Sequence, residues 1–141
     1  MPDPQPTPPA LSRRHLLPVA ESVPAARKFV AQQLDAWGLP HLTDDARLCV
    51  SELVTNVVTH AYAVLINVTL TLRGDRLRIE VTDDDLANPA PDHLPSPGPD
   101  DEGGRGLLLI AALGAASGWT TSLRGKTAWV ELPLEESPPG P

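Results

Sequence analysis

The sequence predicts an α+β fold, a two-layer α/β sandwich whose mainly antiparallel sheet is covered on one face by about three helices. Two observations support this prediction. Helical patterns fill the first part of the chain, and the strands that follow come in pairs joined by short turns. Hairpins, unlike regularly alternating strands and helices, favour antiparallel pairing. At 141 residues the chain has the size of one domain.

The helices are placed by apolar periodicity and by the residues that start and stop them. The first begins at Ser22, an expected N-cap, and ends before Gly38. The second begins at the expected cap Thr43 and runs to about Tyr62, with acidic residues at the positive end of its dipole. A third, short and very apolar, is expected in the run LLLIAALGAA, with Gly114 and Gly118 helping to end it.

The strands show the two-residue period of a sheet with one buried face. Residues 66–73 and 77–82 alternate apolar and polar side chains around a turn at Gly74, which predicts a hairpin. Two further strands are expected around residues 119–123 and 127–132, joined at residues 124–126, and an edge strand is expected near residues 15–19.

The 17 prolines are clustered, and the clusters divide the chain. Those near the two ends predict disordered tails at residues 1–12 and 135–141, which leaves one domain at residues 13–134. The third cluster, from Asn88 to Pro99, lies between strongly periodic segments. A proline-rich loop at this place predicts a lid at about residues 84–104.

The composition excludes several classes of partner. Lys and Arg number 11 against 18 Asp and Glu, a formal net charge of −7, and direct nucleic-acid binding needs a basic surface instead. No apolar stretch reaches the ~20 residues of a membrane span, and the amino terminus lacks a signal-peptide pattern. Cys49 is the single cysteine, which excludes a disulfide framework and favours a reducing compartment. We therefore expect a cytoplasmic protein without a membrane partner.

Glu52 and Asn56 lie four residues apart in the run SELVTNVVTHA, inside the second helical pattern. Side chains at positions i and i+4 share one helix face, so a carboxylate and a carboxamide are presented together. The pair falls at the edge of an apolar arc that includes Leu53 and Val57. At such an edge a helix that packs on a core can border a cleft, which suits a metal ligand and a proton acceptor.

Asp83 follows the second strand of the predicted hairpin. It continues the register of Leu77 and Val81, so a strand that reaches it turns its carboxylate toward the helix layer. A carboxylate buried there needs a partner. The alternative is that the strand ends earlier and that Asp83 is a solvated acid in a turn with Asp84 and Asp85.

The glycine-rich run Gly103-Gly104-Arg105-Gly106 stands directly before the third helical pattern. Glycines there let backbone N–H groups approach an anion, and the start of a helix adds a partial positive charge. The run is therefore a candidate phosphate-binding loop, although a flexible hinge has the same composition. It matches neither the Walker A pattern nor the dinucleotide-binding glycine pattern.

Together the three motifs resemble the ATP-binding fold shared by gyrase B, Hsp90, sensor histidine kinases and MutL. SELVTNVVTHA resembles the N box of that family, DDDLANP its G1 box and EGGRGLLLI its G2 box, in the same order and with matching spacing. The short chain and the runs ELVTNVVTHA and GRGLLLI are most similar to the serine kinases that act as anti-sigma factors. The resemblance covers about residues 15–133.

The resemblance implies ATP and Mg²⁺ as cofactors and a role for each matching residue. Asn56 corresponds to the magnesium ligand. Glu52 corresponds to the acid that accepts the proton of a serine hydroxyl on a partner protein as the γ-phosphoryl group moves. Asp83 corresponds to the acid that binds the adenine amino group. Gly104 and Gly106 correspond to the glycines that bring backbone N–H groups to the phosphates. Arg105 lies between them, and its alternatives are contact with the γ-phosphate and an exposed place in the lid.

The chain departs from the family in the G1 box, which is usually written DxGxG. Asp85 and Ala87 stand where the two glycines are expected. A second carboxylate beside a polyphosphate site is unfavourable unless Asp85 turns away or meets the metal.

Two function classes follow from the resemblance and its departure. The first is a serine/threonine protein kinase that phosphorylates an anti-sigma factor antagonist of the STAS type and, in its other state, sequesters a sigma factor. The second is a non-catalytic nucleotide-binding regulatory module that acts by protein–protein binding alone. A detached histidine kinase catalytic domain and a hydrolytic ATPase are weaker alternatives.

In this family the uncovered side of the sheet can form a homodimer, and Trp129 is expected on that side, where a half-exposed tryptophan is also common.

Overall fold

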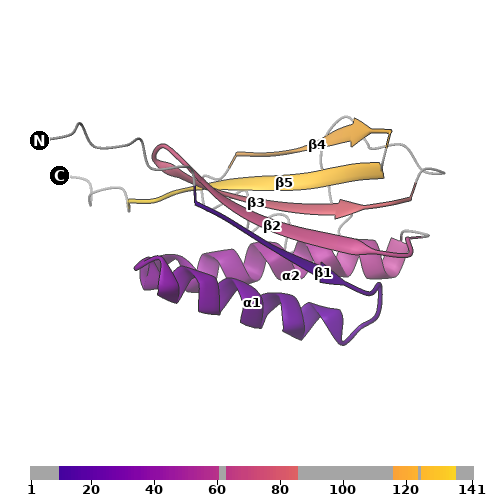
Figure 1. The fold of residues 1–141 in the computed structure, drawn as a ribbon, viewed down its shortest axis with the longest axis horizontal. Helices are drawn as coiled ribbons and strands as arrows, with labels where there is room; N and C mark the ends of the chain where they lie inside the picture. Colours follow the sequence, from indigo (N-terminus) through magenta and orange to yellow (C-terminus); the bar gives the residue numbers. More distant parts are fainter. Residues whose placement is uncertain (1–9, 61–62, 86–115, 124, 136–141) are drawn as a thin grey trace, which may run out of the picture.

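The computed structural model describes residues 10–60, 63–85, 116–123 and 125–135, and these residues form two layers (Figure 1). One layer is a five-stranded antiparallel sheet, and the other, within the described residues, consists of two long helices. The predicted α+β sandwich is therefore confirmed, whereas the third predicted helix and most of the predicted lid lie outside the described residues. In chain order the elements are β1 (Leu11–Leu16), α1 (Ser22–Ala36), the 3₁₀ turn η1 (Pro40–Leu42), α2 (Thr43–His60), β2 (Ile66–Arg73), β3 (Arg76–Asp83), β4 (Ala116–Ser122) and β5 (Gly125–Pro133).

The strands are ordered β1-β2-β3-β5-β4, and every neighbouring pair is antiparallel. The β2–β3 hairpin turns at Gly74 and Asp75, as the sequence predicts. Gly74 has a φ of 57°, a conformation that a side chain disfavours. Because β5 pairs with β3 and β4 lies outside it, β3 is the central strand, and Asp83 at its end is flanked by strands on both sides.

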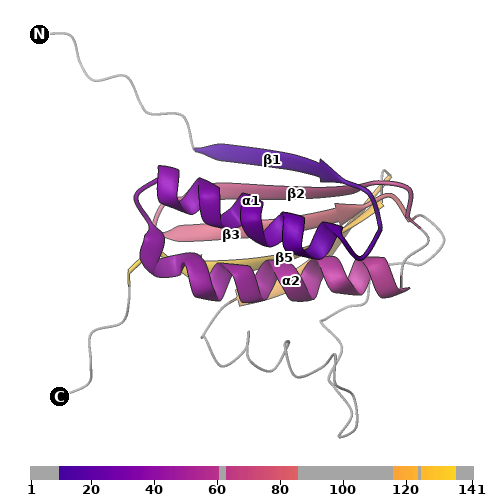
Figure 2. The same ribbon diagram turned by 90° about the horizontal axis from the view of Figure 1, so that it is seen from below.

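Both helices lie side by side across one face of the sheet (Figure 2). The strands alternate so that every second residue points into this interface, and α2 packs on β3 and β5. None of the described helices is long and apolar enough to cross a membrane. The largest fully buried side chains of the core are those of Val30, Leu34, Val50, Leu53, Val54, Ile66, Val68, Leu70, Leu77, Ile79 and Leu132.

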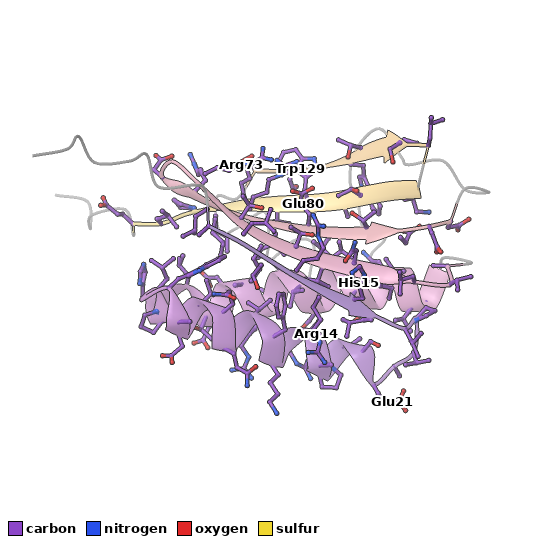
Figure 3. All side chains as sticks on the ribbon, in the orientation of Figure 1. Arg14, His15, Glu21, Arg73, Glu80 and Trp129 are labelled. Carbon is purple, nitrogen blue, oxygen red and sulfur yellow. The ribbon has the colours of Figure 1, made fainter. Side chains whose placement is uncertain are left out.

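The opposite face of the sheet carries no helix among the described residues, and Trp129 lies on it (Figure 3). The Arg78 guanidinium stacks over the Trp129 ring at 4.3 Å from its centroid. Arg78 also forms ion pairs with Glu80, at 3.3 Å, and with Glu131, at 3.2 Å. Gly118 of β4 lies against the same ring, where a Cβ atom would come within 2.9 Å of it. A cation, an aromatic ring and two acids therefore form one connected cluster on this face.

The helix starts differ from the prediction, because Ser22 lies inside α1 and Thr43 has a helical conformation. Glu21 is the N-cap of α1, and Ser22 is its first helical residue. The hydroxyl of Ser22 donates instead to the carbonyl oxygen of Leu17, at 2.5 Å. Thr43 has helical dihedral angles, with φ −59° and ψ −47°, because η1 continues directly into α2. The predicted N-caps at Ser22 and Thr43 were therefore wrong.

Three strand boundaries also differ. The edge strand is β1, earlier than the expected residues 15–19, because its pairing with β2 ends at Leu16 opposite Ile66; it includes two residues of the predicted tail 1–12. Gly118 was expected to end a helix but lies inside β4, which begins at Ala116. Gly125 and residue 126 were placed in a turn but belong to β5. The sheet hydrogen bonds extend these strands beyond the segments with clear alternation.

Candidate functional site

Glu52 and Asn56 lie on α2 next to its packed face. Both side chains are half-buried, whereas Leu53 and Val57 between and beside them are buried. Loss of solvent raises the pKa of the Glu52 carboxyl above its ordinary value. A raised pKa makes the carboxylate a better proton acceptor, which suits the base role that the resemblance implies.

Asp83 ends β3 and turns its side chain toward the helices, with only 1% of its surface exposed. It follows Leu77, Ile79 and Val81 on the same side of the strand, and each of these is buried as well. The alternative of a solvated loop acid is therefore wrong. Since α2 packs on β3, the helix that carries Glu52 and the strand that carries Asp83 are direct neighbours.

The two oxygens of the Asp83 carboxyl differ in their surroundings. Oδ1 accepts a hydrogen bond from the backbone N–H of Asp85, at 2.9 Å. Oδ2 is buried and has no hydrogen-bond partner. Such an atom is costly unless something donates to it. Asp83 thus offers one unused acceptor on the helix-facing side of the sheet.

The pKa of Asp83 is raised above its ordinary value, mainly because the carboxyl is removed from water. The N–H of Asp85 and the charge of Lys126 lower the pKa, and the charges of Asp85 and Asp84 raise it. The effect of burial on the pKa of Asp83 is larger than the combined effect of the groups that stabilise its carboxylate.

The acids after Asp83 have partners of their own. Asp84 Oδ1 accepts hydrogen bonds from the backbone N–H groups of Val64, at 2.8 Å, and Leu65, at 3.3 Å. Asp85 is 3% exposed, and its Oδ2 lies 3.9 Å from Nζ of Lys126. The extra acid in the G1 box is therefore directed to a cation of β5, which partly offsets its charge.

Lys126 belongs to the candidate site but is not among the residues that the sequence patterns predict. The expected turn at residues 124–126 left its direction undefined, whereas in the structure it lies opposite Asp83 in the β3–β5 register and shares its side of the sheet. The signal that could have found it is the period of β5, since Lys126 continues the inward positions of Ala128 and Val130.

Gly125, beside Lys126, allows the backbones of β5 and β3 to approach closely. Its φ is 142°, which side chains rarely adopt, and a Cβ atom there would overlap the carbonyl oxygen of Asp83. Glycine at this position therefore helps to set the place of Asp83.

The predicted phosphate-binding residues Gly104, Arg105 and Gly106 lie outside the described residues. Within the part of the chain that is described, no group of three or more His, Cys, Asp or Glu side chains could hold a metal. A cavity of about 370 Å³ lies at the β2–β3 turn, at the opposite end of β3 from Asp83, and no predicted site residue borders it. The candidate site is therefore the α2 flank together with the end of β3.

These features define a class of protein: an α+β domain in which the helix that carries Glu52 and Asn56 lies beside an inward aspartate. The family model described as a histidine kinase-like ATPase domain matches residues 18–131. The chain belongs to this family.

One solved structure shows the same relation. The histidine kinase domain of the blue-light activated histidine kinase from Erythrobacter litoralis EL346 is similar to this chain, with a TM-score of 0.52 and 27% sequence identity. The match covers 65% of this chain and 44% of that one, so the chain spans less than half the length of that structure. No curated protein matches the sequence.

Proposed function

We propose that this domain binds ATP with Mg²⁺ and is a cytoplasmic serine/threonine protein kinase that phosphorylates an anti-sigma factor antagonist of the STAS type. In its other state it sequesters a sigma factor. The family supports the nucleotide, and the N-box and G2-box runs support the regulatory class. The single observation that carries the site is Oδ2 of Asp83, a buried acceptor without a partner in a domain of this family. The amino group of adenine supplies the donor that this atom lacks.

Each remaining residue has a part in this proposal. Asn56 holds Mg²⁺ through its amide oxygen, a hard donor of the kind that this ion prefers. Gly104, Arg105 and Gly106 contact the phosphates, as the resemblance implies. Glu52 accepts the proton of the attacking serine hydroxyl while the serine oxygen bonds to the γ-phosphorus and ADP leaves. The raised pKa of Glu52 supports this role because it strengthens the carboxylate as a base.

Phosphoryl transfer tests the kinase directly. With radiolabelled ATP, Mg²⁺ and a STAS-type antagonist, we expect label on a serine of the antagonist. Glu52→Gln should lower the rate at least ~100-fold, because a positioned general base contributes about that much, while ATP affinity stays within a few-fold. Glu80→Gln, on the uncovered face of the sheet, is the matched control and should keep the wild-type rate.

The pH dependence gives a second readout of the same step. Because the pKa of Glu52 is raised, the transfer rate should fall as the pH falls through that value. Equal labelling by the wild type and Glu52→Gln would refute the base assignment.

A second function is favoured by the altered G1 box. Asp85 and Ala87 replace two glycines of the usual pattern. A domain with a modified nucleotide loop can act by binding its partners, with or without nucleotide, and without turnover. In the labelling experiment this module would bind the antagonist or sigma factor and leave it unlabelled.

A homodimer through the uncovered face around Trp129 is part of either proposal, and sedimentation of the Trp129→Ala variant tests it.

A further inference from the structure

Lys126 and Asp85 form an ion pair that connects the start of β5 to the segment after β3. Their Nζ and Oδ2 atoms are 3.9 Å apart, and the side chains are only 12% and 1% exposed. Opposite charges so far from water attract each other strongly, because little solvent screens them. The pair therefore restrains the position of Asp85.

Asp85 in turn orients Asp83. Its backbone N–H donates to Oδ1 of Asp83 at 2.9 Å, so one oxygen of that carboxyl is occupied and Oδ2 is the one left unpaired. If Asp85 moved, its N–H would leave Oδ1 and the carboxyl could rotate about its χ2 angle. The contacts thus run from Lys126 through Asp85 to the oxygen that the proposed function assigns to adenine.

We propose that Lys126 and Asp85 are positioning residues for base recognition: the ion pair fixes the Asp85 N–H, which holds the Asp83 carboxyl so that Oδ2 meets the 6-amino group of the purine. This inference rests on the proposed nucleotide binding. The ion pair with Lys126 also explains why Asp85 is compatible with the site despite its negative charge.

The base selectivity of binding isolates this role. Inosine triphosphate carries a carbonyl oxygen in place of the 6-amino group, so at position 6 it presents an acceptor to Oδ2 instead of a donor. The ratio of ATP to inosine triphosphate affinity therefore reports the orientation of Asp83. A loss of fold stability or of phosphate contacts weakens both nucleotides alike and leaves the ratio unchanged.

The experiment is calorimetric titration of the full chain with each nucleotide in the presence of Mg²⁺. The wild type should bind ATP at least ~10-fold more tightly than inosine triphosphate, because a site built to donate to or accept from a substrate group rejects the analogue that lacks it. Asp83→Asn should abolish this preference. Lys126→Met and Asp85→Asn should each reduce the preference at least ~5-fold, whereas Lys126→Arg, which keeps the charge, should retain most of it.

The double variant Lys126→Met/Asp85→Asn removes both buried charges and covers the case in which a single variant does not fold. Its selectivity should also be reduced. The matched control is Arg78→Met, which removes another ion-paired cation of the sheet, 14% exposed, from the opposite face. Arg78→Met should keep the wild-type ratio.

The outcomes separate the two proposals. If the wild type and the Arg78 variant prefer ATP, Asp83→Asn loses the preference and the Lys126 and Asp85 variants keep it, the positioning role is wrong and the proposed function stands. If the wild type binds neither nucleotide, the proposed function itself fails, and the positioning role fails with it.

Discussion

Burial changes the acidity of two carboxyl groups in the same direction. The pKa values of both Glu52 and Asp83 are raised because the ionised forms lose water. Burial also raises the pKa of the Cys49 thiol to about 12, so this cysteine stays protonated and acts as a small core residue. The two acids sit where the proposed chemistry needs a base and an acceptor, whereas Cys49 has no part in it.

The stability of the domain should depend on the ionisation of Asp83. Because its folded-state pKa lies above the unfolded value, the folded state holds the proton more tightly, and the free energy of unfolding falls as the pH rises through the folded-state pKa. Asp83→Asn removes the buried charge, so its stability relative to the wild type should increase on going from acid to neutral pH. Urea unfolding at a series of pH values measures this difference.

The matched control for that series is Thr55→Ala, which removes a side chain on the exposed side of α2 and no ionisable group. Its stability difference from the wild type should stay nearly flat with pH. A pH-independent difference for Asp83→Asn would contradict the assigned cause of its pKa shift.

Gly125 is the backbone position on which Asp83 depends most closely. Gly125→Ala combines an unfavourable φ of 142° with an overlap on the Asp83 carbonyl oxygen, and should cost about 3 kcal/mol or more. Gly74→Ala is the control, because its φ is also positive, at 57°, but no atom lies near its Cβ. It should cost only about 1–2 kcal/mol. Equal losses in denaturant unfolding would show that the close contact with β3 is unimportant.

At the scale of elements, α2 joins the core to the site. Its buried residues pack on β3 and β5, and its half-buried flank carries Glu52 and Asn56. The same helix thus gains its stability from one side and presents the polar pair on the adjoining side. A substitution on the packed side that shifts α2 would therefore also shift Glu52 and Asn56.

Leu53 offers a test of how α2 packs on the sheet. It is 1% exposed and adjoins Glu52, so Leu53→Ala should lower the free energy of unfolding by about 2–5 kcal/mol. Thr55→Ala, on the exposed side of the same helix, should change it by less than about 0.5 kcal/mol. Thermal or urea unfolding measures both. A small effect for Leu53→Ala would mean that α2 is not held on the sheet as the structure shows.

The sequence predicted the elements whose periodicity is regular. The β2–β3 hairpin and its turn followed from alternation, and the same register placed Asp83 on the helix-facing side. The two helix starts could not be predicted from residue preference, because η1 runs directly into α2 and the Ser22 hydroxyl bonds to the carbonyl oxygen of Leu17. Tertiary contacts there outweigh local preference.

The site was predicted in part for a related reason. Helical spacing is enough to place Glu52 and Asn56 on one flank. Lys126 was missed because its place is decided by pairing between β3 and β5, which depends on residues far apart in the chain. The partners of Asp84 and Asp85 are likewise non-local and carry no signal in the adjacent sequence.

At the scale of the whole molecule, ligand binding and folding are linked. A ligand that binds only the folded state adds RT ln(1 + [L]/Kd), about 2.7 kcal/mol at a concentration of 100 Kd. We expect ATP with Mg²⁺ to stabilise the wild-type domain in this way. Asn56→Ala should lose most of the gain, because the proposed magnesium ligand is removed, and chelation of Mg²⁺ should bring the wild type to the level of the variant.

The control for this measurement is Gln33→Ala, which removes an amide from the other helix, α1, and should keep the full stabilisation. Unfolding with and without ATP, Mg²⁺ and a chelator supplies all the required comparisons. An Asn56→Ala domain that gains as much from ATP and Mg²⁺ as the wild type would exclude the magnesium role of that residue.

Asp84 has a mechanical consequence for the whole domain. Its carboxylate accepts hydrogen bonds from the backbone N–H groups of Val64 and Leu65, and Asp84 directly follows Asp83 in the chain. Asp84 therefore ties the end of β3 to the connection that leads into β2. A contact that displaces the exposed residues Val64 and Leu65 would therefore break hydrogen bonds to the residue next to Asp83.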